Sequence, residues 1–534
     1  MKRILPIGIQ DFPDIRQRGF VYVDKTARIH ELITGSGKAF FLSRPRRFGK
    51  SLLCSTLEAI FDAKRELFGE VAGYPALAIN SLDWEWKKHP VIRLNLNTGD
   101  YVNEGLEGLR NALRLQLLMQ AERNGIELLD AGVVDQFNYL IWKASEKAGE
   151  KAAVIIDEYD KPLLDTIDNT AVHESIRAML KSFYGILKSA DPYLRFLLLT
   201  GVTKFSQVSV FSDLNQLSDL TLDSGYADLC GWTEEEVLQN FEPEIAVIVK
   251  ERDRKREDYL ESLRKYYNGY RFTKRKLKVY NPFGLLKHFD RSGDFFPYWY
   301  ETGTPTFLIK LITQQKVNIS NLGNMRIKYE NFHKYDVENM EALPVLYQSG
   351  YLTITDYDEE RERFTLDYPN IEVSSSFTRA LLKQYLKVPE ERSRALINQL
   401  PDALEDGEIE KAIDAIRQYL AAVPYDIIEE TEKYFQTAVH LIFTMFGLNC
   451  RSEVRIAAGR IDTLVETKNF VYCFEFKLDK TANEALAQID TKEYMLPWTG
   501  SGKKLFKVGV NFDSQKRNIG ECNITAPQHS ATEV

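Results

Sequence analysis

The chain has 534 residues, too many for one ordinary domain, and 44% of them are hydrophobic, enough to build several packed cores. A net charge of −8 argues against a surface coated in positive potential, although a local basic groove could lie within that total. The five cysteines lack the close pairs of a zinc site or a secreted disulfide framework, and no apolar run reaches the roughly 18 residues of a membrane span. We therefore expect a cytoplasmic protein of two to four domains, without a signal peptide or a membrane segment.

The stretch FFLSRPRRFGKSLL (40–53) predicts a strand, a loop and a helix. Its apolar start is typical of a buried strand, and apolar residues after the Gly-Lys-Ser recur at the spacing of one helix face. In that setting the N–H groups of the loop, including that of Gly49, and the positive end of the helix bind phosphate. Lys50 is expected to reach the terminal phosphates and Ser51 to ligate Mg²⁺. A helix that merely begins with these residues is the alternative.

Three arginines precede this motif. Arg44 stands where the usual pattern has its first Gly, so the loop must take a different path into its turn. Arg44, Arg46 and Arg47 add donors that could face phosphate. They could equally form salt bridges with a neighbouring subunit, which leaves a homo-oligomer open.

A second nucleotide motif follows in KAAVIIDEYDKP (151–162), where an apolar strand leads directly to Asp157 and Glu158. In a Walker B segment the first carboxylate holds the Mg²⁺ shell and the second polarises the attacking water. A buried strand that ends in solvated acids is the alternative. Because both motifs occur in order on one chain, we predict that the first half binds a nucleotide.

Further elements fit this assignment. PVIRLNLN (90–97) predicts another strand between the two motifs, followed by amphipathic helices near 104–123 and 132–148. After the second motif, LRFLLLTGVTKFS predicts a strand with Thr203 near its carboxyl end. This order matches the additional-strand class of P-loop ATPases, in which such a polar group senses the γ-phosphate. For Thr203 a plain turn or helix-capping hydroxyl is an equal alternative.

The middle of the chain reads as helical. GWTEEEVLQNF (231–241) predicts a helix with Thr233 as N-cap and Glu236 at its third position. Arg271 could reach a nucleotide from this lid, although stacking on neighbouring aromatics is the more common use of such an arginine. Residues 342–387 run helix, strand, charged turn, strand, helix, the outline of a winged helix that either binds DNA or only packs.

The C-terminal region contains an acidic hairpin. Period-2 alternation from Val471 puts Glu475 and Lys477 on one face of a strand, opposite an aromatic face that we expect to enter the core. A two-residue turn at 468–469 pairs the preceding strand with it and, by counting back, sets Asp462 opposite Glu475. Like charges in that arrangement repel each other, so a cation is expected between them.

A divalent metal suits this pair of acids, because Mg²⁺ takes oxygen ligands and is commonly held by one or two carboxylates and waters. We predict that Asp462 and Glu475 ligate it. Lys477 could then orient or deprotonate the attacking water and stabilise charge on a phosphate. An ordinary hairpin, in which Lys477 neutralises two acids as a surface salt bridge, is the alternative.

The motifs together resemble a known family. FVYVDKT, FLSRPRRFGKSLL, IIDEYDKP, TGVTKFS, YNGYRF and YNPFGLL look like the AAA-ATPase-like family of bacteria and archaea, and RPRRFGKS is that family's usual loop. The hairpin resembles the PD-(D/E)xK nuclease superfamily, with Ile461 in place of the Pro. The resemblance implies ATP binding and hydrolysis. It also suggests Glu432, Glu453 and Gln488 as accessory nuclease residues, each with a surface role as the alternative.

The expected fold is α/β: an additional-strand P-loop NTPase with a helical lid and winged-helix-like middle, then a small α/β restriction-endonuclease-like domain. ATP and Mg²⁺ are the expected cofactors, and nucleic acid, with DNA favoured, the expected partner. The competing hypothesis is an ATP-driven switch whose nuclease-like domain only docks DNA or protein. The predicted segments are the ATPase domain (1–230), lid (231–330), winged-helix-like segment (331–390), helical linker (391–425), nuclease-like domain (426–520) and a disordered tail (521–534).

Overall fold

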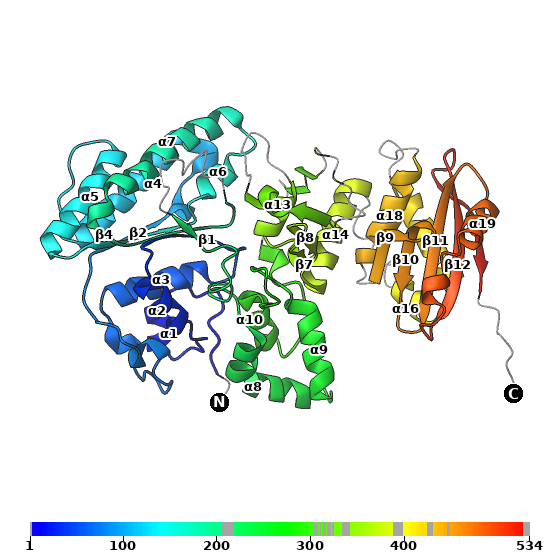
Figure 1. The fold of residues 1–534 in the computed structure, drawn as a ribbon, viewed down its shortest axis with the longest axis horizontal. Coiled ribbons are helices and arrows are strands. Elements are labelled where there is room, and N and C mark those ends of the chain that lie inside the picture. The colour runs from blue at the N-terminus through cyan, green and yellow to red at the C-terminus, as the bar shows by residue number, and fades with distance from the viewer. Residues whose placement is uncertain are drawn as a thin grey trace. The chain divides into compact units, whose positions relative to one another are not determined.

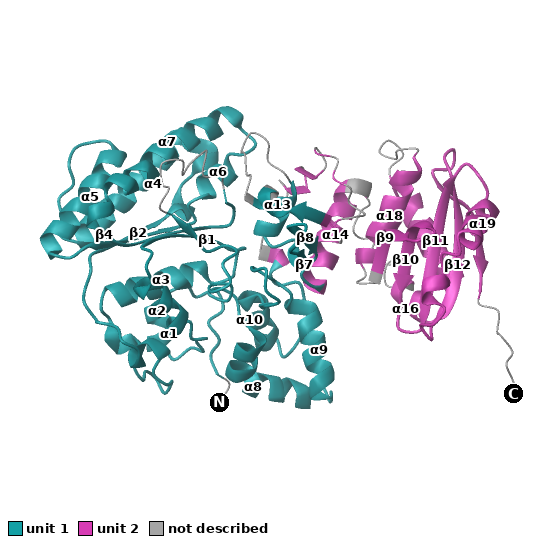
Figure 2. Cartoon of the chain, in the orientation of Figure 1, with its two compact units in different colours: residues 1–299, 326–370 teal, residues 300–325, 371–534 magenta. Residues whose placement is uncertain are grey.

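The computed structural model of the chain forms two compact units, one of residues 1–299 and 326–370, the other of residues 300–325 and 371–534 (Figure 2). The structure describes residues 3–204, 217–302, 308–309, 311–312, 315, 317, 322, 325–333, 342–387, 399–423, 431–445 and 449–526. The division at residue 370 falls inside the predicted winged-helix-like segment, so its two strands and its last helix belong to different units.

The first unit is built on a five-stranded parallel sheet in the order β2-β3-β4-β1-β5. Its strands are β1 (Ala39–Ser43), β2 (Val91–Asn95), β3 (Ala152–Asp157), β4 (Leu194–Gly201) and β5 (Ser218–Asp219). β4, which follows both nucleotide motifs in sequence, lies between their strands β1 and β3, while β2 lies at the edge. This arrangement confirms the predicted additional-strand class.

Helices cover both faces of this sheet (Figure 1). One face carries α1 (Phe12–Gln17), α2 (Thr26–Thr34) and α3 (Lys50–Phe61), and the other α4 (Tyr101–Arg123), α5 (Val133–Ala148), α6 (Lys161–Asp165) and α7 (Thr170–Ser189). The helices predicted near 104–123 and 132–148 are α4 and α5. Because both faces are covered, β1 and β3 are buried along their whole length, as their apolar runs predict.

The lid region packs three helices, α8 (Glu234–Glu251), α9 (Arg256–Tyr267) and α10 (Pro282–Asp290), around a core that also takes in Leu5, Val21 and Val23. α8 begins with the predicted capping box: the Thr233 hydroxyl accepts the N–H of Glu236, whose carboxylate accepts the N–H of Thr233. The guanidinium of Arg271 donates to backbone carbonyls, including that of Thr273 at 3.0 Å, contacts that suit a structural role.

A three-stranded sheet in the order β6-β8-β7 completes the first unit. Its elements are β6 (Met325–Lys328), α12 (Tyr329–His333), α13 (Ala342–Gln348), β7 (Thr353–Asp358) and β8 (Arg363–Asp367). β7 and β8 pair antiparallel across the charged turn, and α13 precedes them, so the predicted helix, strand, turn and strand are confirmed.

The second unit has a five-stranded mixed sheet in the order β13-β12-β11-β10-β9, in which β11 and β12 run parallel. Its strands are β9 (Asn449–Ile456), β10 (Gly459–Glu466), β11 (Phe470–Leu478), β12 (Lys504–Asp513) and β13 (Asn518–Thr525). Its helices are α14 (Ile371–Leu386), α16 (Gln399–Glu405), α17 (Ile409–Ala421), α18 (Glu432–Met445) and α19 (Ala482–Thr491). α18 and α19 lie on opposite faces of the sheet (Figure 1).

Two sequence expectations need correction in this unit. The predicted tail begins later, because β13 continues to Thr525, which pairs with Lys507 of β12; residues 527–534 lie outside the described residues. β11 is buried on both faces rather than on its aromatic face alone. Phe443 of α18 packs on Phe474, and α19 places Ile489 in one cluster with Val471 and Cys473.

Candidate functional site

The phosphate-binding loop of the first unit connects β1 to α3. Gly49 has a φ of +96°, a left-handed conformation that favours glycine, and it is the residue from which α3 begins. Lys50 is 4% exposed, and its amino group donates to the carbonyls of Arg44 at 3.0 Å and Pro45 at 3.2 Å. The lysine is thus held inside its own loop, next to the positive end of the helix.

The three arginines of the loop have different surroundings. Arg44 is fully buried, and its terminal nitrogens donate to the carbonyls of Ser43, Thr221 and Tyr226 while its guanidinium stacks 4.4 Å from the ring of Phe272. Those contacts suit a structural role, unlike the phosphate contact considered from the sequence. Arg46 and Arg47 are exposed, and Arg47 lies over the ring of Phe283 at 4.8 Å.

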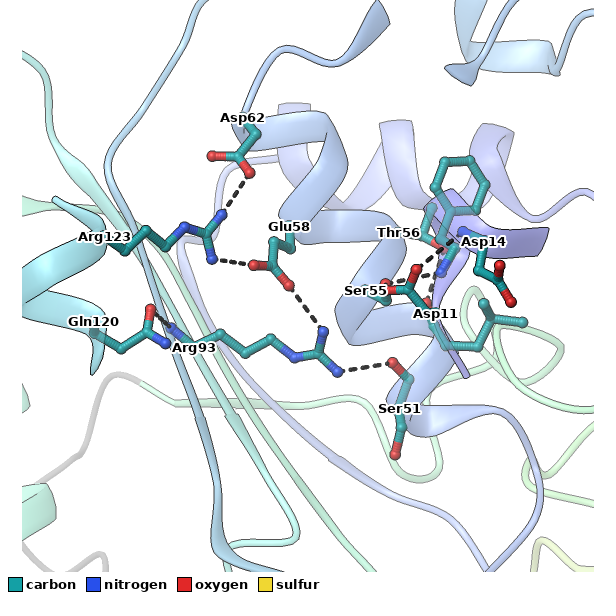
Figure 3. A network of polar contacts seen from close by, with 12 residues as sticks. Asp11, Asp14, Ser51, Ser55, Thr56, Glu58, Asp62, Arg93, Gln120 and Arg123 are labelled. Atoms are coloured by element: carbon teal, nitrogen blue, oxygen red, sulfur yellow. Dashed lines mark hydrogen bonds and ion pairs between the residues drawn. The ribbon is translucent and has the colours of Figure 1, made fainter. Parts of the chain in front are cut away.

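An ion network that sequence reasoning missed supports Ser51 (Figure 3). Arg93 of β2 donates to the carbonyl of Ser51 at 3.4 Å and to Glu58 at 2.8 Å, and Arg123 bridges Glu58 to Asp62. Figure 3 shows the hydroxyl of Ser51 on the side away from Arg93. Arg93 is the one charged residue in the apolar run PVIRLNLN, and this exception to the pattern could have predicted a buried ion pair.

Asp157 ends β3 and is completely buried. Its Oδ1 accepts the hydroxyl of Thr200, on the neighbouring strand β4, at 2.6 Å, and its Oδ2 has no hydrogen-bond partner among the described residues. A buried carboxylate oxygen without a donor is costly, and a divalent cation would satisfy it. Glu158 follows with a φ of +56° and is partly exposed at the same edge of the sheet.

Asp160 is a third acid of this motif, and sequence reasoning passed over it. It is fully buried and accepts the N–H groups of Val202 at 3.0 Å and Thr203 at 2.6 Å, and the Thr203 hydroxyl at 2.7 Å. Burial raises the pKa of Asp160 to about 6, although the hydrogen bonds from Thr203 oppose that shift. The Thr203 hydroxyl, considered as a phosphate sensor from the sequence, donates its hydrogen bond to Asp160.

A cavity of about 120 Å³ adjoins the phosphate-binding loop. It is lined by Gly49 of the loop and mainly by apolar side chains from several segments of the unit, among them Val23, Leu52, Leu229 and Phe283; Gln10, Lys25 and Arg47 also line it. None of the lining residues is Asp or Glu. An apolar cavity that starts at the loop suits a planar, largely apolar group carried by a bound phosphate chain.

In the second unit, the predicted hairpin register is confirmed for four residue pairs, from Glu466–Val471 to Thr463–Phe474. The described ladder ends there, one pair before Asp462 and Glu475. Oδ2 of Asp462 instead accepts the N–H of Phe476 at 2.9 Å, a donor that a regular ladder would give to a backbone carbonyl. Asp462 is therefore anchored against β11 by its side chain.

Glu475 is enclosed rather than displayed on a surface. It is 1% exposed, Lys477 donates to its Oε1 at 3.1 Å, and its Oε2 has no hydrogen-bond partner among the described residues. Burial, followed by the charge of Asp462, raises the pKa of Glu475 to about 7. Burial also raises the pKa of Asp462, which is 9% exposed. Because the charge of Asp462 acts on Glu475, the two carboxyl groups lie close together.

The two acids fit a hard cation. Across the described part of the chain, no group of three or more His, Cys, Asp or Glu side chains is arranged to hold a metal. Two carboxylates are nevertheless sufficient for Mg²⁺, which keeps several of its waters, and Oε2 of Glu475 is an open ligand atom. Asp462 and Glu475 are the residues that would hold Mg²⁺ here, and the ion would supply an activated water.

The three accessory residues suggested by the family resemblance differ in whether they act on the two acids. Glu432, exposed at the start of α18, adds negative charge that raises the pKa of both Asp462 and Glu475. Glu453 forms an ion pair with Arg460 at 3.3 Å, and Gln488 donates to the hydroxyl of Tyr494 at 3.4 Å. The structure thus links Glu432 to the two acids, while these contacts of Glu453 and Gln488 are made with other residues.

The first unit contains a P-loop-like α/β domain, and the second unit carries a small nuclease-like α/β domain. A family model described as predicted AAA-ATPase matches residues 6–211, and one described as PD-(D/E)XK nuclease superfamily matches residues 430–522. The chain is 35% identical over 529 residues to an Azotobacter chroococcum mcd 1 protein named "Uncharacterized protein in vnfD 5'region", covering 97% of this chain and 98% of that one. The chain belongs to the AAA-ATPase-like family that carries a C-terminal PD-(D/E)XK nuclease domain.

Among the helices that the structure describes, none combines the length and the apolar character needed to cross a bilayer.

Proposed function

We propose that the protein binds and hydrolyses ATP and couples this to Mg²⁺-dependent cleavage of phosphodiester bonds in nucleic acid, with DNA as the substrate. One observation carries the proposal. Each candidate site holds a buried carboxylate oxygen without a hydrogen-bond partner among the described residues, Oδ2 of Asp157 in the first unit and Oε2 of Glu475 in the second. Both atoms are suitable ligands for the cation that phosphoryl chemistry requires.

In the ATPase site, the N–H groups at the start of α3 bind the phosphates, with Gly49 permitting the turn that aims them. Lys50 exchanges its carbonyl partners for phosphate oxygens. Ser51 and Asp157 hold Mg²⁺, and Glu158 polarises the attacking water. The contacts of Arg44 favour a role in shaping the loop over one in binding phosphate.

The cavity beside Gly49 supports adenine as the base. Guanine presents an N1–H and a 2-amino group, whose burial requires acceptors that a carboxylate usually supplies, and no Asp or Glu lines this cavity. Adenine has a single amino donor and a largely apolar ring, so its desolvation on entering this cavity costs less free energy than that of guanine.

In the nuclease site, Asp462 and Glu475 hold Mg²⁺ and Lys477 lies beside Glu475. Lys477 orients the attacking water and offers positive charge to the phosphate as negative charge develops on it. Burial and Asp462 raise the pKa of the Glu475 carboxyl group, so Glu475 would hold the cation in its ionised form.

The test uses the full-length protein and two variants, Lys50→Ala and Asp462→Ala, with Asp414→Ala, an exposed aspartate of α17, as the matched control. Phosphate release from ATP and cleavage of DNA are measured in Mg²⁺, each with and without ATP. We expect Lys50→Ala to lose ATP hydrolysis at least 100-fold and Asp462→Ala to lose cleavage while retaining hydrolysis. If neither variant changes a cleavage activity, the nuclease part of the proposal is wrong.

A second candidate function is an ATP-driven switch whose nuclease-like domain binds DNA or protein without cutting. The ion pair of Glu453 with Arg460, and the lack of a three-residue metal cluster in the described ranges, favour it. In that case Lys50→Ala alters DNA binding, measured by fluorescence anisotropy with and without ATP, and no protein form cleaves.

A further inference from the structure

The residues after Glu158 fix an uncommon backbone conformation. Glu158 has a φ of +56°, in the left-handed region that a side chain with a Cβ adopts only at a cost. Such a conformation persists where the surroundings hold it. In the role proposed above, Glu158 must present its carboxylate to the attacking water, so whatever fixes this backbone also fixes the base.

Tyr159, which is completely buried, provides the first set of hydrogen bonds that fix this backbone. Its N–H donates to the carbonyl of Thr200 at 3.0 Å, and its hydroxyl donates to the carbonyl of Thr203 at 2.9 Å. Tyr184 of α7 in turn donates to the carbonyl of Tyr159 at 3.2 Å. These bonds tie the residue after Glu158 to the carboxyl end of β4.

Asp160 provides the second set of hydrogen bonds that fix this backbone. Its carboxylate receives the N–H groups of Val202 and Thr203 and the Thr203 hydroxyl, three donors from the chain just after β4. Gly201 permits this approach, because a Cβ on it would lie 2.5 Å from Oδ1 of Asp160. The turn that follows β3 is thus joined to the end of β4 through the buried carboxylate of Asp160.

We propose that Asp160 is a positioning residue for ATP hydrolysis, holding Glu158 in place by locking the turn that follows β3 to the end of β4. The inference rests on the proposed ATPase function. All three donors lie within 3.0 Å of Oδ2, and the N–H of Val202 also lies 3.3 Å from Oδ1, so both carboxylate oxygens face donors. In Asp160→Asn the amide nitrogen would meet a donor at either oxygen position. Asparagine therefore keeps the size of the side chain and disturbs the lock.

The test is the steady-state kinetics of ATP hydrolysis by wild-type protein and Asp160→Asn. We expect kcat to fall at least tenfold and KM to change less than threefold, because the hydrogen bonds that Asp160 accepts from Val202 and Thr203 do not involve the phosphate-binding N–H groups. Asp165→Asn, which removes a carboxylate paired with Lys161 on the same short helix, should leave both constants within twofold. Thermal unfolding checks that each variant folds.

A double variant separates positioning from a general loss of structure. If Asp160 acts through Glu158, then Glu158→Gln/Asp160→Asn hydrolyses ATP no more slowly than Glu158→Gln alone. Should Asp160→Asn fail to fold, Thr203→Val removes one of the same donors, and its effect should likewise vanish in the Glu158→Gln background. Multiplicative effects, or a KM that rises by as much as kcat falls, would overturn the inference.

The two levels of failure are distinct. A wild-type protein that hydrolyses no ATP overturns the proposed ATPase function and this inference together. An active wild type whose kcat survives Asp160→Asn within threefold overturns only the positioning role.

Discussion

Lys477 donates a hydrogen bond to Oε1 of Glu475 at 3.1 Å, while Oε2 of the same carboxylate is buried without a partner among the described residues. The acid is therefore only half satisfied, and its pKa is raised to about 7 by burial and by Asp462. Its ionisation and the binding of a cation must be coupled, because Mg²⁺ binds the ionised form.

We predict that Mg²⁺ stabilises the nucleotide-free protein more at pH 8 than at pH 6. Below its pKa of about 7 the Glu475 carboxyl group holds a proton that the metal must displace, so affinity rises with pH and levels off above 7. Thermal unfolding with and without Mg²⁺ measures the shift. In Glu475→Gln the pH-dependent part should vanish; an identical shift in the variant would mean that the ion binds elsewhere.

Glu475→Gln should also stabilise the metal-free protein at pH 8. The folded pKa of about 7 lies above the ordinary glutamate pKa of 4.5, so the folded state favours the protonated acid. The stability that this preference for the protonated acid contributes is fully present below pH 4.5 and is lost as pH rises through 7. At pH 8 the ionised, buried Glu475 therefore lowers the free energy of unfolding, and Glu475→Gln removes this cost, which is at most about 3 kcal/mol. Urea unfolding at pH 8 and pH 4.5 checks this, and an equal difference at both values would contradict it.

We predict that replacing Arg44 lowers the stability of the folded protein. It is buried and holds three carbonyls, and hydrogen bonds from charged groups contribute roughly 1.5–3 kcal/mol each, so Arg44→Ala is expected to cost at least about 3 kcal/mol. Arg46→Ala, at an exposed site two residues away, should stay within about 0.5 kcal/mol. Denaturant unfolding compares them, and equal costs would show that Arg44 is not the structural arginine of the loop.

Gly350 should affect nucleotide binding from outside the loop. Its φ is +89°, and a Cβ on it would lie 2.8 Å from the Cβ of Pro45, whose carbonyl accepts a bond from Lys50. Gly350→Ala is expected to weaken ATP binding on the order of tenfold, because strain of roughly 1–3 kcal/mol would fall on the loop. Calorimetric titration with ATP measures it. Gly500→Ala, whose Cβ would meet nothing within 4 Å, is the matched control, and equal affinities for the two variants would refute the link.

Much of both sites followed from local sequence. The strand, loop and helix around Gly49 and the strand before Asp157 were readable because each motif is contiguous and its hydrophobic period identifies the element. The hairpin register was readable for the same reason: a two-residue turn fixes the bond from the N–H of Thr467 to the carbonyl of Phe470, observed at 2.9 Å, and the period of two fixes the next pairs.

The tertiary structure alone decided which groups meet across the fold. It inserts β4 between β1 and β3, turns Arg44 toward backbone carbonyls, gives Asp160 its three donors and covers the acidic face of β11 as well as the aromatic one. These outcomes depend on contacts between segments far apart in the chain, and no local period or motif encodes the direction in which a buried polar side chain finds its partner. The sequence identified the chemical groups, and the packing of distant elements determined which of them are free to act.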